Sequence, residues 1–254
     1  GTKGSVITSA SSAPIIGNNN ATNVSSQTML DNVSIENIEF LGDGSSSNQD
    51  GVHFAQTTNA TIRNCKFTSI GRDGVYIGHP SQSVLYNETL NVVIDNCIFT
   101  NCNRLAVSGL LNSSSIDFEP TAPDGHMQNI YFANNTMSNA SFKLFNTKRS
   151  STLKLKNVTI ENNTFNSLTE FRSFLATDIT VRGNTFNDAI GFNIDRAERS
   201  SFLNNTVNTT THSGDDWLDI NSSEYEVRGN RVSGFTNGIT KSTGAAAYPP
   251  EINE

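Results

Sequence analysis

Asn32-Val-Ser-Ile-Glu-Asn-Ile-Glu-Phe40 is a nine-residue unit whose pattern recurs along most of this 254-residue chain. Apolar residues stand at its second and fourth positions, a polar pair follows, and a large apolar residue closes it. Further copies begin at Asn59, Asn91, Asn129, Asn157 and Asp178, with weaker ones around 201–207 and 224–232. Each copy predicts a period-two strand that meets a fixed corner. Successive starts lie 27, 32, 38, 28 and 21 residues apart, a spacing typical of solenoid coils that bury their cores by stacking.

A second short strand lies between successive units and repeats in the same phase. Its first examples are 51–54 (Gly-Val-His-Phe), 74–77 (Gly-Val-Tyr-Ile) and 105–107 (Leu-Ala-Val). Alternation points the larger apolar side chains inward and leaves His53, Tyr76 and Ala106 on one outer face. Because equivalent residues return in the same phase and direction, we expect parallel strands wound into an all-β solenoid of about eight coils.

The corner of the unit stacks small polar residues from coil to coil. Cys65 and Cys97 occupy the same corner position in consecutive units, so they should lie about one strand spacing, ~4.8 Å, apart. We expect them to pack as free thiols, with a disulfide as the alternative. Cys102 has no metal-ligand spacing to another Cys or to a His cluster. The asparagines expected to form an internal amide ladder are Asn37, Asn64 and Asn96.

The composition points away from several classes of function. Only 16% of the residues are charged, and the net charge is −7. Nucleic-acid binding is not expected, because it depends on clustered Lys and Arg. No apolar run approaches the ~20 residues of a membrane helix. A surface rich in Asn, Ser, Thr and Gly favours an extracellular, cell-surface or virion-borne protein.

The repeat defines one elongated unit from 32 to 240. Residues 1–31 are expected to form a lead-in segment or an irregular first coil, and 241–254 a C-terminal tail. The ends of a solenoid need covering. We therefore expect this chain to be part of a larger protein or to be covered by partner subunits.

Charged residues precede the second strand of three successive coils. Asp50 comes before 51–54, Asp73 before 74–77, and Arg104 before 105–107. A shared phase places these three residues on one line, with the two carboxyl groups ~5 to 9 Å apart, the range used by glycosidases with two catalytic carboxylates. The alternative is ordinary turn chemistry, because an Asp before Gly caps backbone amides.

The third coil is the longest and brings more polar residues to the same region. Within the expansion at 108–126, Asp117 and Glu119 alternate with apolar residues and should point outward together. Asp124 and His126 border them, and His53 and Tyr76 project from the neighbouring strands. We expect a single groove, with Asp73 or Glu119 as general acid and Asp50 or Asp117 as base. Substrate contacts are then expected from His53, Tyr76, Arg104, Asp124 and His126.

These parallel repeats resemble the right-handed parallel β-helix, or pectin-lyase-like, superfamily of polysaccharide lyases, polygalacturonases, uronan epimerases and phage tailspikes. The resemblance covers 32–240 and implies a right-handed parallel β-helix. Locally, 50–54 and 71–77 are similar to polygalacturonase segments, which places Asp50 and Asp73 on two of that family's catalytic carboxylates. The next coil departs from that family, because its Gly-His-Gly is replaced by Asn103-Arg104-Leu105. The run 115–120 also resembles phage and bacterial β-helix repeat proteins, many of which are thought to act on surface glycans.

The sequence therefore predicts a protein that binds and cleaves an extracellular or cell-surface polysaccharide by a two-carboxylate mechanism. Two alternatives remain open. One is a polysaccharide lyase or uronan epimerase, with a base and a charge neutraliser drawn from His53, Tyr76 and Arg104. The other is a noncatalytic spike or adhesin module, which by its likeness to tailspikes implies a homotrimer. No cofactor is required, although the clustered carboxylates leave calcium possible.

Overall fold

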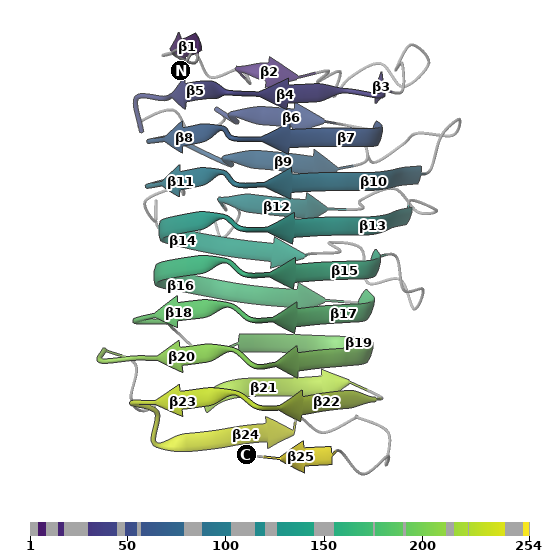
Figure 1. The fold of residues 1–254 in the computed structure, drawn as a ribbon, viewed down its shortest axis with the longest axis vertical. Coiled ribbons are helices and arrows are strands. Elements are labelled where there is room, and N and C mark those ends of the chain that lie inside the picture. Colours follow the sequence, from purple (N-terminus) through teal and green to yellow (C-terminus); the bar gives the residue numbers. More distant parts are fainter. Residues whose placement is uncertain are drawn as a thin grey trace.

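The computed structural model describes residues 5–8, 15–17, 30–44, 49–54, 57–78, 88–102, 115–119, 126–144, 155–174, 176–189, 192–211, 216–222, 224–241 and 251–253. In this part of the chain the strands pair only in parallel and stack coil upon coil into a column (Figure 1). Three ladders of paired strands form the sides of the column. The predicted all-β parallel β-helix is therefore confirmed.

The first ladder carries the start of the nine-residue unit in each coil. It contains β3 (Leu30–Asp31), β4 (Ser34–Glu36), β7 (Thr57–Arg63), β10 (Glu88–Asp95), β13 (His126–Ala133), β15 (Leu155–Glu161), β17 (Ala176–Arg182), the second half of β19 (Phe192–Leu203), β22 (Tyr225–Arg228) and β25 (Glu251–Asn253).

The second ladder follows the corner and carries the end of the unit. It contains β1 (Ser5–Thr8), β5 (Ile38–Leu41), β8 (Lys66–Thr68), β11 (Ile98–Thr100), the first parts of β14 (Thr136–Leu144) and β16 (Thr164–Phe174), β18 (Thr185–Asn187), β20 (Thr206–Asn208) and β23 (Arg231–Ser233).

The third ladder holds the second short strand of each coil. It contains β2 (Ile16–Gly17), β6 (Val52–Phe54), β9 (Val75–Gly78), β12 (Ile116–Glu119), the second parts of β14 and β16, the first part of β19, β21 (Asp216–Ser222) and β24 (Asn237–Lys241). Since β1 and β2 pair with β5 and β6, stacking begins before residue 32.

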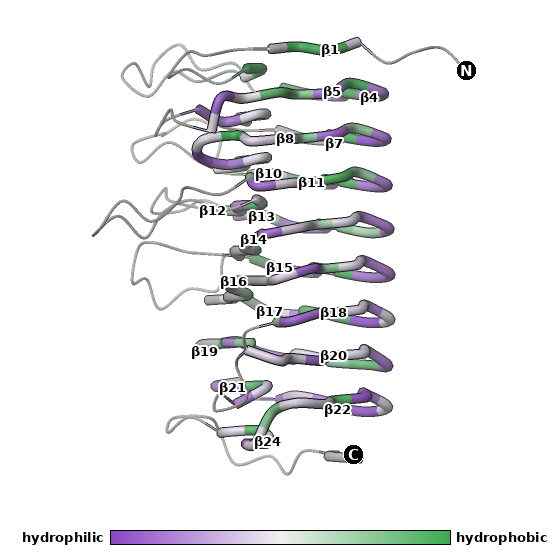
Figure 2. Tube along the Cα trace, turned by 90° about the vertical axis from the view of Figure 1, so that its left-hand side faces the viewer, coloured by the Kyte–Doolittle hydropathy of each residue, from purple (hydrophilic) through white to green (hydrophobic). Residues whose placement is uncertain are grey.

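The core consists of columns of apolar side chains that run along the axis. In the first three units the closing Phe stacks on its equivalent, with ring centroids 4.7 Å apart for Phe40 and Phe67 and 4.8 Å for Phe67 and Phe99. The rings are nearly parallel, at 4° and 2°. Because each coil covers the apolar face of the next, burial comes from repetition rather than from a central cluster. Seen from the side, every coil alternates apolar and polar stretches (Figure 2).

The corner asparagines differ from our expectation. Asn37, Asn64 and Asn96 are exposed and adopt positive φ angles of 59°, 55° and 54°, so they are turn residues and not an internal ladder. The internal ladder lies one residue later. In this ladder four amides each donate a hydrogen bond of 2.9–3.1 Å to the next, from Asn135 through Asn163, Asn184 and Asn205 to Asn230.

The expanded coil also differs from our expectation. Its strand in the third ladder is β12, whose Ile116 and Phe118 pair with Val75 and Ile77. Residues 105–107 therefore do not take that place and lie outside the described residues. The sequence offered two alternating triplets for this place, and the structure pairs Ile116 and Phe118 with Phe142 and Leu144 on the following strand.

Candidate functional site

A column of polar residues follows the outer face of the third ladder. Strand alternation turns Val52 and Phe54 inward and the residue between them outward, and this phase is kept from coil to coil. The register places in this column His53, Tyr76, Asp117, Lys143, Arg172, Asn193, Asp219 and Thr240. Asp117 thus takes the place that we had expected for Ala106.

The first coils of this column have a buried ionic cluster beside them. His53 Nδ1 lies 2.6 Å from Asp50 Oδ2. Arg72 Nε lies 3.2 Å from Asp50 Oδ1 and 2.9 Å from Asp73 Oδ2, so one nitrogen lies within reach of both carboxylates. The backbone N–H of Asp73 also donates to Asp50 Oδ1, at 3.2 Å. The two aspartates are neighbours on one line, as their shared phase implied.

The carboxylates of this cluster are turned away from solvent. Asp50 is 1% exposed and Asp73 is 0% exposed. Burial alone would lower the pKa of Arg72, but the carboxylates of Asp73 and Asp50 outweigh it and raise the pKa, which keeps the guanidinium charged. In this arrangement neither aspartate faces a substrate, and both are held by Arg72. The cluster therefore suits a positioning role better than direct proton donation to a glycosidic oxygen.

The cluster orients the side chains that do face outward. A carboxylate only accepts hydrogen bonds, so the contact with Asp50 places the proton of His53 on Nδ1 and the lone pair on Nε2. The imidazole lies against the ring of Tyr76, with centroids 4.5 Å apart. The Arg72 guanidinium carbon lies 4.9 Å from the centroid of the same ring. His53 and Tyr76 are therefore fixed by contacts with Asp50 and Arg72.

Asp117 adds a carboxylate to the same column. It pairs in register with Tyr76 and so lies two coils from His53, and it is 6% exposed. Glu119, at the end of the same strand, pairs with Gly78. Only narrow faces of His53 and Asp117 reach the surface, which suits contact with one or two atoms of a substrate.

The remaining predicted site residues do not join this column. His126 begins β13 in the first ladder, on another side of the coil. Arg104 and Asp124 lie outside the described residues. Sequence reasoning missed Arg72, although a lone cation beside the second of two stacked aspartates is a readable signal.

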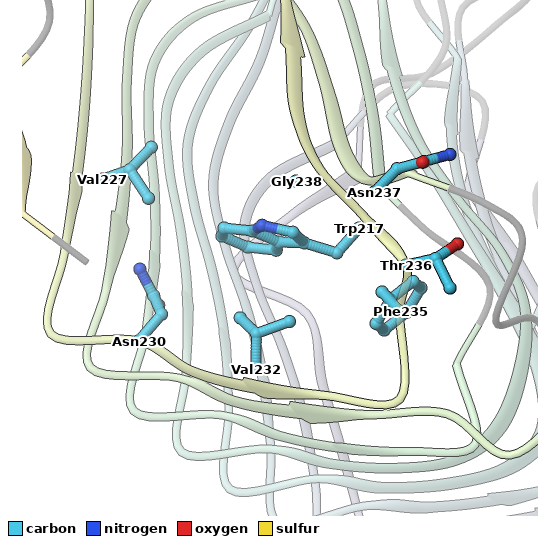
Figure 3. A pocket seen from close by; sticks show the side chains of 8 residues that line it. All are labelled: Trp217, Val227, Asn230, Val232, Phe235, Thr236, Asn237 and Gly238. Carbon is cyan, nitrogen blue, oxygen red and sulfur yellow. The ribbon is translucent and has the colours of Figure 1, made fainter.

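The described residues also line a cavity of about 370 Å³ at the C-terminal coils, far along the solenoid from His53 and Asp117. It lies in the interior of the last coils, where Trp217 faces Val227, Val232 and Phe235 (Figure 3). Val232 is 38% exposed, whereas its partner Val207 one coil earlier is 1% exposed. The cavity is thus the apolar interior left uncovered at the last described layer.

Within the described residues no group of three or more His, Cys, Asp or Glu side chains is placed to hold a metal ion. Nor does this part of the chain contain a helix of the length and apolarity needed to span a bilayer. Calcium binding remains a prediction.

The family model described as a right handed beta helix region matches residues 3–248. No curated protein matches the sequence.

Proposed function

Because the chain belongs to the right-handed β-helix family, we propose that it binds a polysaccharide along the outer face of its third ladder and cleaves it beside His53 and Asp117. The observation that carries this proposal is the unbroken column of polar residues, in which an oriented imidazole, a phenol and a carboxylate lie on consecutive strands. Parallel stacking places successive residues of this column ~4.8 Å apart, so an extended chain of sugars that lies along the column meets one residue position after another.

His53 and Asp117 supply the two proton-transfer groups of the proposed reaction. With its Nδ1 proton held by Asp50, His53 presents Nε2 as a base, and Asp117 lies two strands away across Tyr76. Hydrolysis uses one group to protonate the leaving oxygen and the other to activate water. Asp50, Asp73 and Arg72 then act as positioning residues behind this pair.

Elimination from a uronate is the second candidate. It needs one base close to the sugar and a cation to offset the carboxylate, and the Asp50–His53 pair provides such a base. The strand register continues from Asp117 to Lys143 and then to Arg172 on the next two strands. Elimination would therefore use residues on the same strands as hydrolysis, but its product would be an unsaturated sugar.

A panel of acidic and neutral polysaccharides tests the proposal and separates its two forms. New reducing ends without ultraviolet absorption indicate hydrolysis, whereas unsaturated products that absorb in the ultraviolet indicate elimination. Asp117→Asn and His53→Gln should each lower turnover by about 10²- to 10⁴-fold while the protein stays folded. Glu226→Gln, on the outer face of the first ladder, is the control and should leave turnover unchanged. Glycan binding that survives both substitutions, with no product from any polysaccharide, would instead indicate a noncatalytic adhesin or spike module.

A further inference from the structure

Two of the three cysteines lie directly above one another in neighbouring coils. Arg63, two residues before Cys65, pairs with Asp95, two residues before Cys97. Lys66, directly after Cys65, pairs with Ile98, directly after Cys97, so the two cysteines are aligned. The N–H of Cys65 donates to Cys97 Sγ at 3.4 Å, and the N–H of Ile98 donates to the Cys65 carbonyl at 2.9 Å. Aligned residues of adjacent parallel strands have Cα atoms ~4.8 Å apart. That separation lies within the range of about 4.4 to 6.8 Å that a disulfide bridges.

The third cysteine is arranged differently. Cys102 stands two residues after Thr100, whose partner is Thr68, so the residue stacked against Cys102 is Ile70. It is 0% exposed, and burial raises the pKa of its thiol to about 12. The chain therefore contains one stacked pair of thiols and one isolated thiol of the same residue type.

All three cysteines are free thiols in the structure. We propose that Cys65 and Cys97 form an oxidisable dithiol, which a low-molecular-weight disulfide converts to a bond joining two coils, while Cys102 stays reduced. The site is a redox modification site and is independent of the proposed polysaccharide chemistry.

The reaction is an ordinary thiol–disulfide exchange in two steps. The Cys65 thiolate attacks one sulfur of oxidised glutathione, breaking its S–S bond and releasing one glutathione thiolate. The sulfur of Cys97 then attacks the Cys65 sulfur of the mixed disulfide, gives its proton to the second leaving glutathione, and closes the protein disulfide. The two protein thiols are oxidised, and one glutathione disulfide is reduced to two glutathione molecules.

The local electrostatics favour Cys65 as the attacking group. The contact between the two thiols lowers the pKa of Cys65 and raises that of Cys97. Cys65 is therefore the thiol that loses its proton more readily and attacks first. Both thiols are nearly buried, at 2% and 1% exposed, so the reaction should take hours and require a small oxidant.

Thiol counting in the folded protein tests the proposal. After incubation with oxidised glutathione, unfolding and alkylation, the expected product carries one alkyl group instead of three and weighs two hydrogen atoms less before labelling. Cys97 and Cys102 share one tryptic peptide, because no Lys or Arg separates them, so the mapping uses variants. Cys102→Ser should still lose two thiols. Cys97→Ser should stop at a single glutathione adduct, which is the diagnostic intermediate.

The disulfide should also stabilise the fold reversibly. It closes a loop between neighbouring coils, so the Tm should rise by roughly 5 to 10 °C and return to its starting value with dithiothreitol. The same treatment of urea-unfolded protein shows that the oxidant is active. Retention of three alkylatable thiols in the folded protein, or a bond that includes Cys102, overturns the proposal.

Discussion

Arg72 Nε lies between two buried carboxylates, 2.9 Å from Asp73 Oδ2 and 3.2 Å from Asp50 Oδ1, and so joins neighbouring coils at the candidate site. The side chains of Asp50 and Asp73 are 1% and 0% exposed, and that of Arg72 is 27% exposed. The free energy of folding therefore depends on keeping all three charges together, because a buried charge that loses its partner is costly.

Asp73→Asn should destabilise the protein by about 3 kcal/mol, because it removes one partner of a buried cation. Urea denaturation measures the change in the free energy of unfolding. Asp95→Asn is the matched control, since Asp95 pairs with Arg63 at the surface, where the side chains are 21% and 44% exposed. That substitution should cost less than about 1 kcal/mol. Equal effects of the two substitutions would show that Arg72 finds other partners.

Gly51→Ala should also be strongly destabilising, because a Cβ at this position would lie 2.5 Å from the carbonyl oxygen of Gly74 and 2.8 Å from a ring carbon of Phe67. We expect a loss of more than about 2 kcal/mol in the free energy of unfolding, typical of overpacking against fixed atoms. At Gly238 a Cβ meets nothing within 4 Å, so Gly238→Ala should stay within about 0.5 kcal/mol of the wild type. A tolerated Gly51→Ala would mean that the first coils move apart easily.

Asn163→Ala should cost about 3 kcal/mol, because the Asn163 amide accepts from the Asn135 backbone N–H and donates to the Phe132 carbonyl inside the core. Asn187→Ala tests a ladder that is only partly buried, where Asn187 bonds to Asn166, and should cost about 1 kcal/mol or less. Thermal unfolding of both variants ranks them. If Asn187→Ala lowered the stability more than Asn163→Ala, the partly buried ladder would contribute more to the free energy of unfolding than the internal ladder.

Stability should also depend on pH through Tyr131 and Glu161. The Tyr131 hydroxyl donates to the Glu161 carboxylate, which raises the pKa of Tyr131 from 10.0 to about 12. Burial alone would raise the pKa of Glu161, but hydrogen bonds from Tyr131 and Arg182 lower it below 4.5. The Tyr131 contribution is complete below pH 10 and is lost as the pH rises towards 12, whereas that of Glu161 is lost as the pH falls below 4.5.

Tyr131→Phe isolates the alkaline part of this dependence. Urea midpoints at pH 7, 9 and 11 should show that the advantage of the wild type over the variant shrinks only at the highest pH. Comparing the two proteins at each pH cancels the titration of other tyrosines. A constant difference across this range would contradict a hydrogen bond from Tyr131 to a charged Glu161.

The sequence was sufficient to predict the fold, because successive coils repeat the same inward alternation and a turn-forming Asn or Gly at the same corner. It also placed Asp50 and Asp73 on one line, since both precede a Gly-Val pair. It did not predict which alternating triplet of the long coil enters the third ladder. That choice depends on which side chains fill the space between Val75 and Phe142, a property of the stacked neighbours.

The burial of the aspartates was equally hard to predict. Two stacked carboxylates suggested an open catalytic pair, but Arg72 folds back between them and His53 covers Asp50. Such closure depends on side-chain packing at the corner, which strand periodicity does not encode.

The internal amide ladder gives the solenoid a direction along its axis. Each Nδ2 group also donates to a backbone carbonyl, as Asn163 does to Phe132 and Asn184 does to Ile160, and this fixes which end of every amide is the donor. From Asn135 to Asn205 each amide consequently donates to the asparagine of the next coil toward the C-terminus, and Asn230 accepts the last of these bonds. The two ends of the solenoid are therefore different. Another coil added in the same direction can continue the ladder from donor to acceptor, whereas a coil stacked in the reverse direction would place two amide donors against each other.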